Sequence, residues 1–191
     1  MADNRRDHIA DAAIRALAAG GMRGFTHRAV DRAAGLAEGS TSYYFRTREA
    51  LILAVLARMA ELDMTDVGEL PTLGGTVGLD ELTELVTALA LRWLGEGRDR
   101  TLARYELSLE STRRPELRAK MAEYGSRFRL MAETLLTAAG TPEPRRRAHA
   151  LLACFDGVVY HQLAGVGGNP MDEADLRAAC RDMLATALRP S

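Results

Sequence analysis

Residues able to perform chemistry are few in this sequence, and their spacing favours neither a metal site nor an enzyme active site. Cys154 and Cys180 form no CxxC pair and lie in apolar stretches, which indicates reduced core residues. His161 follows Cys154 by seven residues on the same helical face, but no third metal ligand accompanies them. The sequence contains no carboxylate-and-histidine metal motif, no nucleotide-binding glycine loop and no nucleophile with a candidate base. We therefore expect no metal, no cofactor and no enzymatic activity.

Arginines near the N-terminus are the next residues with a chemical role. The 191-residue chain has 25 Lys and Arg against 26 Asp and Glu, so its net charge of −1 gives no overall signal for nucleic acid. Residues 1–50 hold eight arginines against six acidic residues, a small surplus that only suggests a polyanionic partner. No apolar run approaches the ~20 residues that span a bilayer, and the charged N-terminal segment is not a signal peptide. We expect no membrane association and a cytoplasmic protein.

The elements that must position these arginines are helices, because apolar residues recur with a helical period from end to end. The sequence therefore predicts an all-α fold. Helices are expected over 4–19, 26–34, 37–45 and about 47–65. A Gly- and Pro-containing stretch over 67–78 is expected to be a loop. Longer helices are expected over 79–94, 99–110, 115–139, 144–164 and 172–188.

The second and third helices carry the clearest local signals. Thr26 is a good N-cap, and Phe25 before it can pack on Val30 as a hydrophobic staple. Gly35 can take the left-handed conformation that ends the second helix and turns the chain. Two short helices joined by a glycine turn and supported by a helix on each side are the arrangement of a helix-turn-helix, whose second helix enters the major groove.

The segment from Thr26 to Leu51 resembles the TetR family of transcriptional regulators, whose pattern reads approximately T-x3-I-A-x2-A-G-V-S-x-G-x-L-Y-x-Y-F-x-x-K-E-x-L. The matching residues are Thr26, Val30, Ala34, Gly35, Leu36, Gly39, Tyr44, Phe45, Glu49 and Leu51. The departures are Asp31 for Ala, Ala37 for the capping Ser, Thr41 for Leu, Ser42 for Tyr and Arg48 for Lys. The resemblance implies an N-terminal three-helix helix-turn-helix DNA-binding domain over 1–48. It also implies a connecting helix over about 47–65 and a larger helical effector-binding and dimerisation domain over 49–191.

Within this resemblance, arginines and the start of the second helix are assigned to phosphates, and the third helix to bases. Base readout is expected from hydroxyls, with the methyl group of Thr41 able to meet a thymine methyl. That helix has no Arg or Lys, so we expect Arg28 or Arg46 and groove shape to supply discrimination. Glu38 could instead be a solvated charge, and Tyr44 a core residue. The predicted DNA-binding residues are Thr26, His27, Arg28, Glu38, Gly39, Ser40, Thr41, Tyr43, Tyr44, Arg46 and Arg48.

The remaining helices are expected to supply a dimer interface and a ligand pocket. A homodimer that matches a pseudo-palindrome would make up for weak half-site binding, and the last two helices are apolar over more than one face. The predicted interface residues are Leu152, Phe155, Val159, Leu163, Leu176, Met183 and Leu184. Helices between 79 and 139 would enclose a small, moderately hydrophobic effector. The predicted lining residues are Leu89, Trp93, Arg104, Tyr105, Ser108, Leu109, Met121, Tyr124 and Phe128, with Tyr160 and His161 from the neighbouring helix over 144–164.

The resemblance thus implies a dimeric, sequence-specific repressor that a small ligand releases from operator DNA by a shift in conformational populations. One alternative is a helical ligand carrier or protein-interaction module that no longer binds DNA, and weak salt dependence of DNA affinity would favour it. Another alternative keeps the DNA role without an inducer, and a fully packed domain interior would favour that interpretation.

Overall fold

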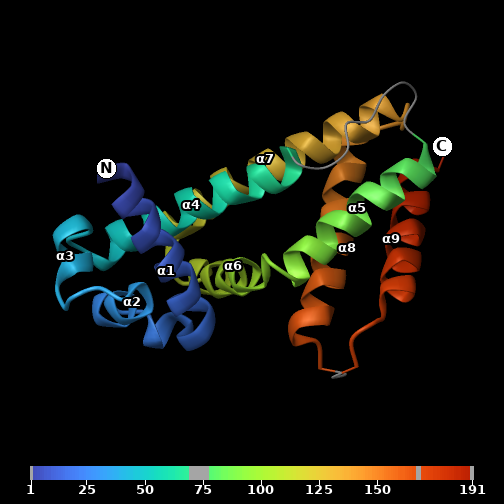
Figure 1. Ribbon diagram of the computed structural model, residues 1–191. Coiled ribbons are helices and arrows are strands. Elements are labelled where there is room, and N and C mark those ends of the chain that lie inside the picture. Colours follow the sequence, from blue (N-terminus) through green and yellow to red (C-terminus); the bar gives the residue numbers. More distant parts are fainter. Residues whose placement is uncertain (1, 69–77, 167–168, 190–191) are drawn as a thin grey trace. The chain divides into compact units, whose positions relative to one another are not determined.

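The computed structural model describes residues 2–68, 78–166 and 169–189, and every regular element within these ranges is an α-helix (Figure 1). The all-α prediction is confirmed. The predicted loop falls largely on residues 69–77, which lie outside the described residues, whereas 67 and 68 belong to a helix. The elements are α1 (Ala2–Gly24), α2 (His27–Ala34), α3 (Ser40–Tyr44), α4 (Arg48–Gly68), α5 (Leu79–Leu94), α6 (Arg98–Ser111), α7 (Pro115–Ala138), α8 (Pro144–Ala164) and α9 (Glu173–Leu188).

Contacts divide the chain into two compact units. The first unit comprises Met1–Asp66 and Glu96–Tyr124, and the second comprises Val67–Gly95 and Gly125–Ser191. The first unit therefore extends beyond residue 48, where the sequence placed a domain boundary, because α6 packs against α1. In the described parts of both units, no helix is long and apolar enough to cross a membrane.

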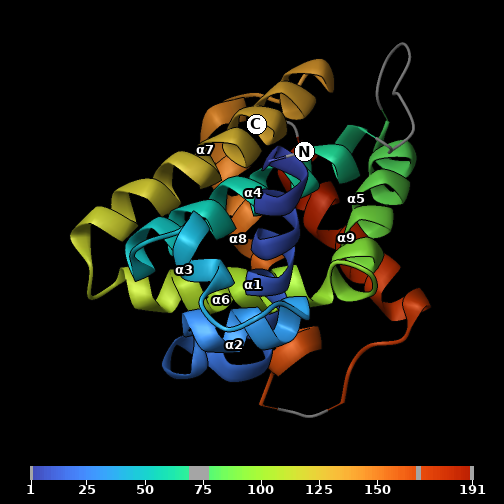
Figure 2. The ribbon, with the colours of Figure 1, turned by 60° about the vertical axis from the view of Figure 1, so that its left-hand side comes forward.

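In the first unit, α1 packs against α2 and α6 (Figure 2). The path of α1 breaks at Gly21, whose φ of 57° and ψ of −173° are not helical. The amide of Met22 donates to Glu106 Oε2 of α6 at 3.1 Å, so the break in α1 is bonded to the neighbouring helix. The interior of this unit includes the fully or nearly fully buried side chains of Ile9, Leu17, Phe25, Val30, Leu51, Ile52 and Met59.

The N-cap and the glycine turn predicted for α2 are confirmed. The hydroxyl of Thr26 accepts a hydrogen bond from the amide of Ala29 at 3.1 Å, so Thr26 caps the helix. Phe25 and Val30, the predicted hydrophobic staple, are both buried. Gly35 ends the helix with a φ of 65°, a left-handed conformation that a residue without a Cβ adopts readily. These features fix where α2 begins and where the chain turns toward α3.

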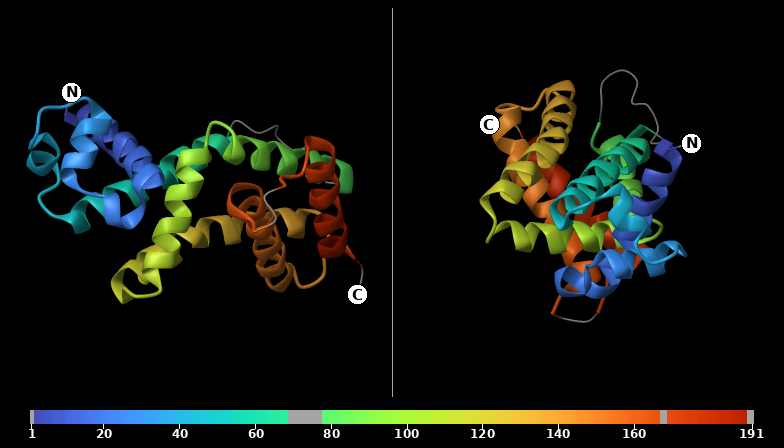
Figure 3. Two further views of the ribbon diagram at one scale, coloured as in Figure 1. Left: turned by 90° about the horizontal axis from the view of Figure 1, so that it is seen from below. Right: turned by 90° about the vertical axis from the view of Figure 1, so that its left-hand side faces the viewer.

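The second unit contains α5, α8, α9 and the later part of α7 (Figure 3). Within it, α9 packs against α5 and α8, and α5 also contacts α8. Small apolar clusters hold these helices together, and they include Leu82 with Leu184 and Leu136 with Ala148. Ion pairs from α9 to α5 lie on the outside of this packing and join Arg177 to Glu84 and Arg181 to Asp80.

Candidate nucleic-acid interface and ligand cavity

The short helix α3 is held at its start by a carboxylate from α2. Gly39, with a φ of 93°, precedes the helix and provides no capping side chain. Asp31 accepts instead from the amides of Gly39 and Thr41, at 2.8 and 2.7 Å, and from the Thr41 hydroxyl at 2.6 Å. An acceptor for the second amide of a helix is what an N-cap residue normally supplies. Asp31, a departure from the family pattern, thus supplies the acceptor that Gly39 cannot provide.

The electrostatics of this cap favour an ionised carboxylate. Asp31 is buried, and burial by itself raises the pKa of a carboxyl group. The hydrogen bonds from Thr41 and Gly39 outweigh that burial and hold the pKa of Asp31 below its ordinary value. Asp31 is therefore a charged, fully bonded group at neutral pH, and it fixes the orientation of α3 on α2.

The solvent-facing side of α3 is formed by Ser42 and Tyr43. Tyr43 is 79% exposed, and its ring makes an edge-to-face contact with the half-buried ring of Tyr44 at 5.1 Å between centroids. Ser42, which is not among the predicted DNA-binding residues, is exposed beside it. The sequence signal for Ser42 was its position within the helix expected over 37–45, but its exposure depends on Thr41 pointing inward, which only the structure shows.

Thr41 does not lie on the solvent-facing side of α3, where base readout was predicted for it. The side chain is fully buried, and its hydroxyl donates to Asp31. The prediction that its methyl group meets a thymine is therefore wrong, because the side chain is part of the capping interaction. Ser40 is half-buried, while Glu38 and Gly39 are exposed in the turn before the helix.

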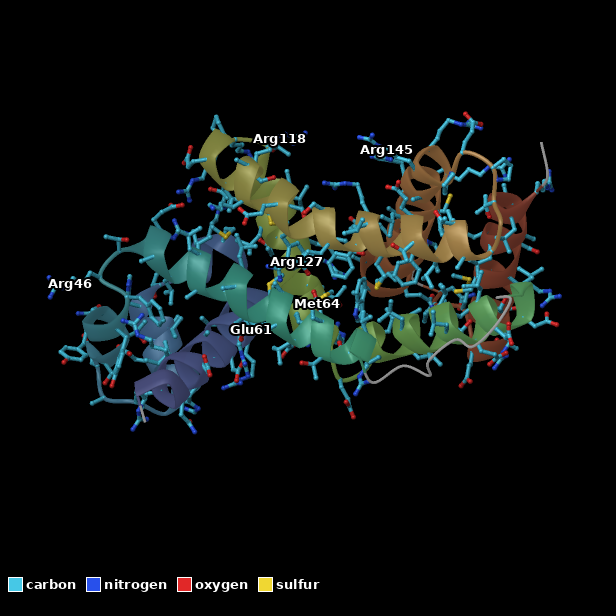
Figure 4. The ribbon with its side chains drawn as sticks, turned by 90° about the horizontal axis from the view of Figure 1, so that it is seen from above. Arg46, Glu61, Met64, Arg118, Arg127 and Arg145 are labelled. Carbon is cyan, nitrogen blue, oxygen red and sulfur yellow. The ribbon has the colours of Figure 1, made fainter. Side chains whose placement is uncertain are left out.

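The arginines near this surface differ in whether they already have a partner within the protein. Arg46 follows α3 and extends away from the ribbon (Figure 4), and it is exposed. Arg28 and Glu38, both well exposed, form an ion pair at 2.7 Å, so Arg28 already has an acidic partner. Arg48 donates to the carbonyl of Met22 through one of its guanidinium nitrogens. Arg46 is therefore the predicted phosphate-binding arginine that extends most freely into solvent.

The first residue of α2 is tied to the end of α3. His27 is half-buried, and its Nε2 lies 2.7 Å from the carbonyl oxygen of Phe45, to which the ring N–H donates. Thr26 is exposed, and its hydroxyl oxygen serves as the α2 cap. The bond from His27 fixes the chain that leaves α3 toward Arg46.

A buried ionic network joins α4, α6 and α7 within the first unit. Arg100 Nε lies 2.7 Å from Asp63 Oδ1, and the same guanidinium contacts Asp66. Arg104 lies 3.9 Å from Asp63 Oδ2, and the Tyr124 hydroxyl donates to that oxygen. Burial raises the pKa of Asp63, although Arg104, the Tyr124 hydrogen bond and Arg100 oppose it. Burial also raises the pKa of the Tyr124 phenol, which therefore stays a neutral donor.

The second unit contains a cavity of about 410 Å³. It lies among α5, α7, α8 and α9, next to the last residues of α4. Its volume is within the ~300–1,000 Å³ range of small-molecule sites. The described lining residues are Val67, Gly68, Leu82, Leu85, Val86, Leu89, Trp93, Phe128, Met131, Ala132, Leu135, Leu136, Leu151, Leu152, Phe155, Met183 and Leu184.

Three of the predicted pocket residues, Leu89, Trp93 and Phe128, line this cavity. The predicted polar residues do not. Arg104 and Tyr124 belong to the ionic network of the first unit, and Tyr160 is 47% exposed on α8. His161 is exposed too, while Tyr105, Ser108, Leu109 and Met121 belong to the first unit. Among the described residues, no group of three or more His, Cys, Asp and Glu is placed to hold a metal ion.

The predicted dimer residues mostly face the interior of their own unit. Leu152, Phe155, Met183 and Leu184 line the cavity. Val159 and Leu176 are also buried, and Leu163 is half-buried. Phe155, Val159, Leu176 and Leu184 are therefore core residues of the monomer and form no exposed apolar face, whereas Leu152, Leu163 and Met183 are half-buried. The exposed positions of α8 and α9 include, beside charged side chains such as Asp156 and Arg177, the small residues Ala150, Ala153, Cys154, Gly157, Ala174 and Ala178. Cys180 is buried as expected, but the prediction that Cys154 is a core residue is wrong.

Comparison with known proteins gives matches over both parts of the chain. The family model described as "Bacterial regulatory proteins, tetR family" matches residues 9–55, and "Tetracyclin repressor-like, C-terminal domain" matches 77–190. A TetR-family member from Streptomyces coelicolor A3 is 32% identical, with a TM-score of 0.70 over 94% of this chain and 97% of that chain. Multidrug binding protein EbrR, solved with imidazole, is 35% identical, with a TM-score of 0.66 over 94% of each chain. A transcriptional regulator from Rhodococcus sp. Rha1, 20% identical, shares the fold with a TM-score of 0.77 over 96% of this chain and 95% of that chain. No curated protein matches the chain.

Proposed function

Because the chain belongs to the TetR family of transcriptional regulators, we propose that it is a dimeric repressor that a small molecule releases from operator DNA. The observation that carries the DNA role is the capped helix α3, which presents Ser42 and Tyr43 to solvent beside the exposed Arg46. A helix fixed in this way can place its hydroxyls against base edges while the arginine contacts phosphate. Action on DNA implies a cytoplasmic location.

Anisotropy titration tests the DNA role. Labelled DNA from beside the gene of this protein is titrated against scrambled DNA of equal length at two salt concentrations. We expect tight, salt-sensitive binding that prefers the native sequence, because phosphate contacts release counterions. Tyr43→Ala should lower that preference by about tenfold, since one specific base interaction is worth roughly 1–3 kcal/mol. Arg113→Ala, at an exposed residue of the α6–α7 corner, is the control. Equal and weak binding to both DNAs would favour a carrier or interaction module.

The dimer is proposed to form through the exposed small residues of α8 and α9. Ala153 and Gly157 lie one turn apart on α8, and Ala174 and Ala178 lie one turn apart on α9. Small side chains allow helices of two subunits to approach closely in a two-fold interface. Ala153→Arg should give monomers in light scattering and weaken operator binding, whereas Ala88→Arg on the exposed side of α5 should do neither.

The cavity of the second unit is the proposed effector site. EbrR, solved with imidazole, ethidium and proflavin, supports a small-molecule effector for this chain as well. An effector releases operator DNA only if it binds the DNA-incompetent conformation more tightly than the competent one. Addition of such a molecule should therefore lower the anisotropy of a preformed operator complex.

A further inference from the structure

The cavity of the second unit contains no charged group among the residues described as lining it. Its seventeen lining residues are aliphatic, aromatic, glycine or methionine, and none has an ionisable side chain. The indole N–H of Trp93 is the one side-chain N–H or O–H among them. The sequence predicted polar anchors for this site, and the structure places all of them elsewhere.

The charged residues of the surrounding helices lie outside the cavity. On α5, Asp80 and Glu84 pair with arginines of α9 at exposed positions. On α7, Arg129 and Glu133 line a separate, open hollow that also includes Arg145 of α8. None of these residues belongs to the cavity lining. A charged ligand would therefore lose water without gaining a described counter-ion.

We infer that the effector is an uncharged, apolar molecule and that the cavity rejects cations and anions. This inference rests on the proposed effector function of the cavity. A charge buried without a partner is strongly unfavourable, whereas apolar surface gains free energy on leaving water. The difference predicts that a cation binds at least about 100-fold more weakly than a neutral molecule of similar size.

The aromatic part of the wall favours a ligand with a planar ring. The ring of Trp93 lies 5.6 Å from Phe128 and 5.5 Å from Phe155 between centroids, with interplanar angles of 89° and 64°. Edge-to-face contacts of this kind present both ring faces and ring edges to a bound aromatic group. The volume of about 410 Å³ limits the ligand to a compact molecule.

The position of Trp93 also provides the assay. Trp93 is the single tryptophan of the chain, so its fluorescence reports on this cavity alone. The full-length protein is titrated with N-phenyl-1-naphthylamine, which is neutral and apolar, and with ethidium, which is cationic. We expect saturable quenching of Trp93 by the neutral probe, and a dissociation constant for ethidium at least about 100-fold higher.

Two cavity variants and one control identify the binding site. Ala132→Leu fills the cavity from α7, and Leu85→Phe narrows it from the half-buried side of α5. Each should weaken neutral-probe binding at least about tenfold, since a single methylene already changes the occupancy of an apolar site by that factor. Ala88→Leu, exposed on α5, should leave binding unchanged. The second variant keeps the test valid if Ala132→Leu does not fold.

Two outcomes overturn the inference. Ethidium that binds as tightly as the neutral probe, and that both cavity variants weaken, would show that the cavity accepts cations. Absence of binding by either probe, with a higher melting temperature for Ala132→Leu, would show that the cavity is unused space. Operator binding by the unliganded protein is measured on the same sample. If the unliganded protein does not bind the operator, the proposed repressor function is contradicted. If it does bind, only the inference about the ligand is contradicted.

Discussion

Removal of the Asp31 carboxylate should loosen α3 and weaken operator binding. Asp31 holds two backbone amides and one hydroxyl of the segment 39–41. The variant Asp31→Ala leaves these donors without that acceptor, and the Thr41 donors lie in the interior. Each orphaned buried donor costs roughly 1–3 kcal/mol, and the N-cap itself is worth about 1 kcal/mol.

These contributions are not additive, so we expect the free energy of unfolding to fall by about 2–4 kcal/mol, which is less than their sum. If α3 must be ordered to bind, about 2 kcal/mol of local destabilisation lowers operator affinity roughly 30-fold. Asp31→Asn keeps one acceptor oxygen and should lose about half as much free energy.

The pH dependence has a definite sign. Since the folded pKa of Asp31 lies below its unfolded value, the stabilisation is fully present above the unfolded pKa, at about pH 4. It is lost as the pH falls through the folded pKa. The stability difference between the wild type and Asp31→Asn should therefore be constant from about pH 5 to 8 and shrink below about pH 4.

Urea denaturation, operator anisotropy and amide hydrogen exchange measure these effects. Exchange of the Gly39 and Thr41 amides should accelerate in Asp31→Ala while amides of α8 keep their rates. Wild-type operator affinity in Asp31→Ala, with unchanged exchange at Gly39 and Thr41, would refute the assignment of Asp31 as the cap of α3.

Three further predictions concern other residues of the first unit. Arg46→Ala should reduce the slope of log affinity against log salt concentration by about 0.9 for each phosphate that the variant no longer binds. Arg113→Ala is the control, and the same slope in both variants would show that Arg46 does not contact phosphate. Thr41→Ser keeps the hydroxyl bonded to Asp31, so operator preference should be retained; a loss of preference would mean that the methyl group contacts DNA after all. Asp63→Asn should lower the free energy of unfolding by about 3–5 kcal/mol, because it breaks a buried ion pair, and Tyr124→Phe by about 1.5–3 kcal/mol. Urea denaturation midpoints that stay at the wild-type value in both variants would contradict the structural role of the network.

The sequence was informative wherever a structural signal is local. The Thr26 cap, the burial of Phe25 and Val30, and the turn at Gly35 each depend on residues within about five positions, and the structure has all three. The all-α architecture likewise follows from the apolar period along each helix. These features can be predicted without knowing which helices pack against each other.

The site residues that could not be predicted depend on which helices meet. A helical period shows that Phe155 and Leu184 face apolar surroundings, but it does not distinguish a cavity of the same unit from a partner subunit. Arg104 and Tyr124 have the residue types of pocket anchors, yet they contact Asp63 of α4, which is far from both in the sequence. Asp31 was visible only as an unexplained departure, because its role depends on how α2 and α3 cross.

Because the residue that caps α3 lies on α2, it determines how the DNA-binding helices could be re-engineered. A graft that transplants only α3 from a relative would place a foreign segment on a cap, Asp31, that belongs to α2 of this chain. A chimaera should therefore exchange α2, the turn and α3 as one cassette. Conversely, Ser42 and Tyr43 make none of the capping hydrogen bonds, so a library randomised at these two positions can explore new operators without disturbing the support of the helix.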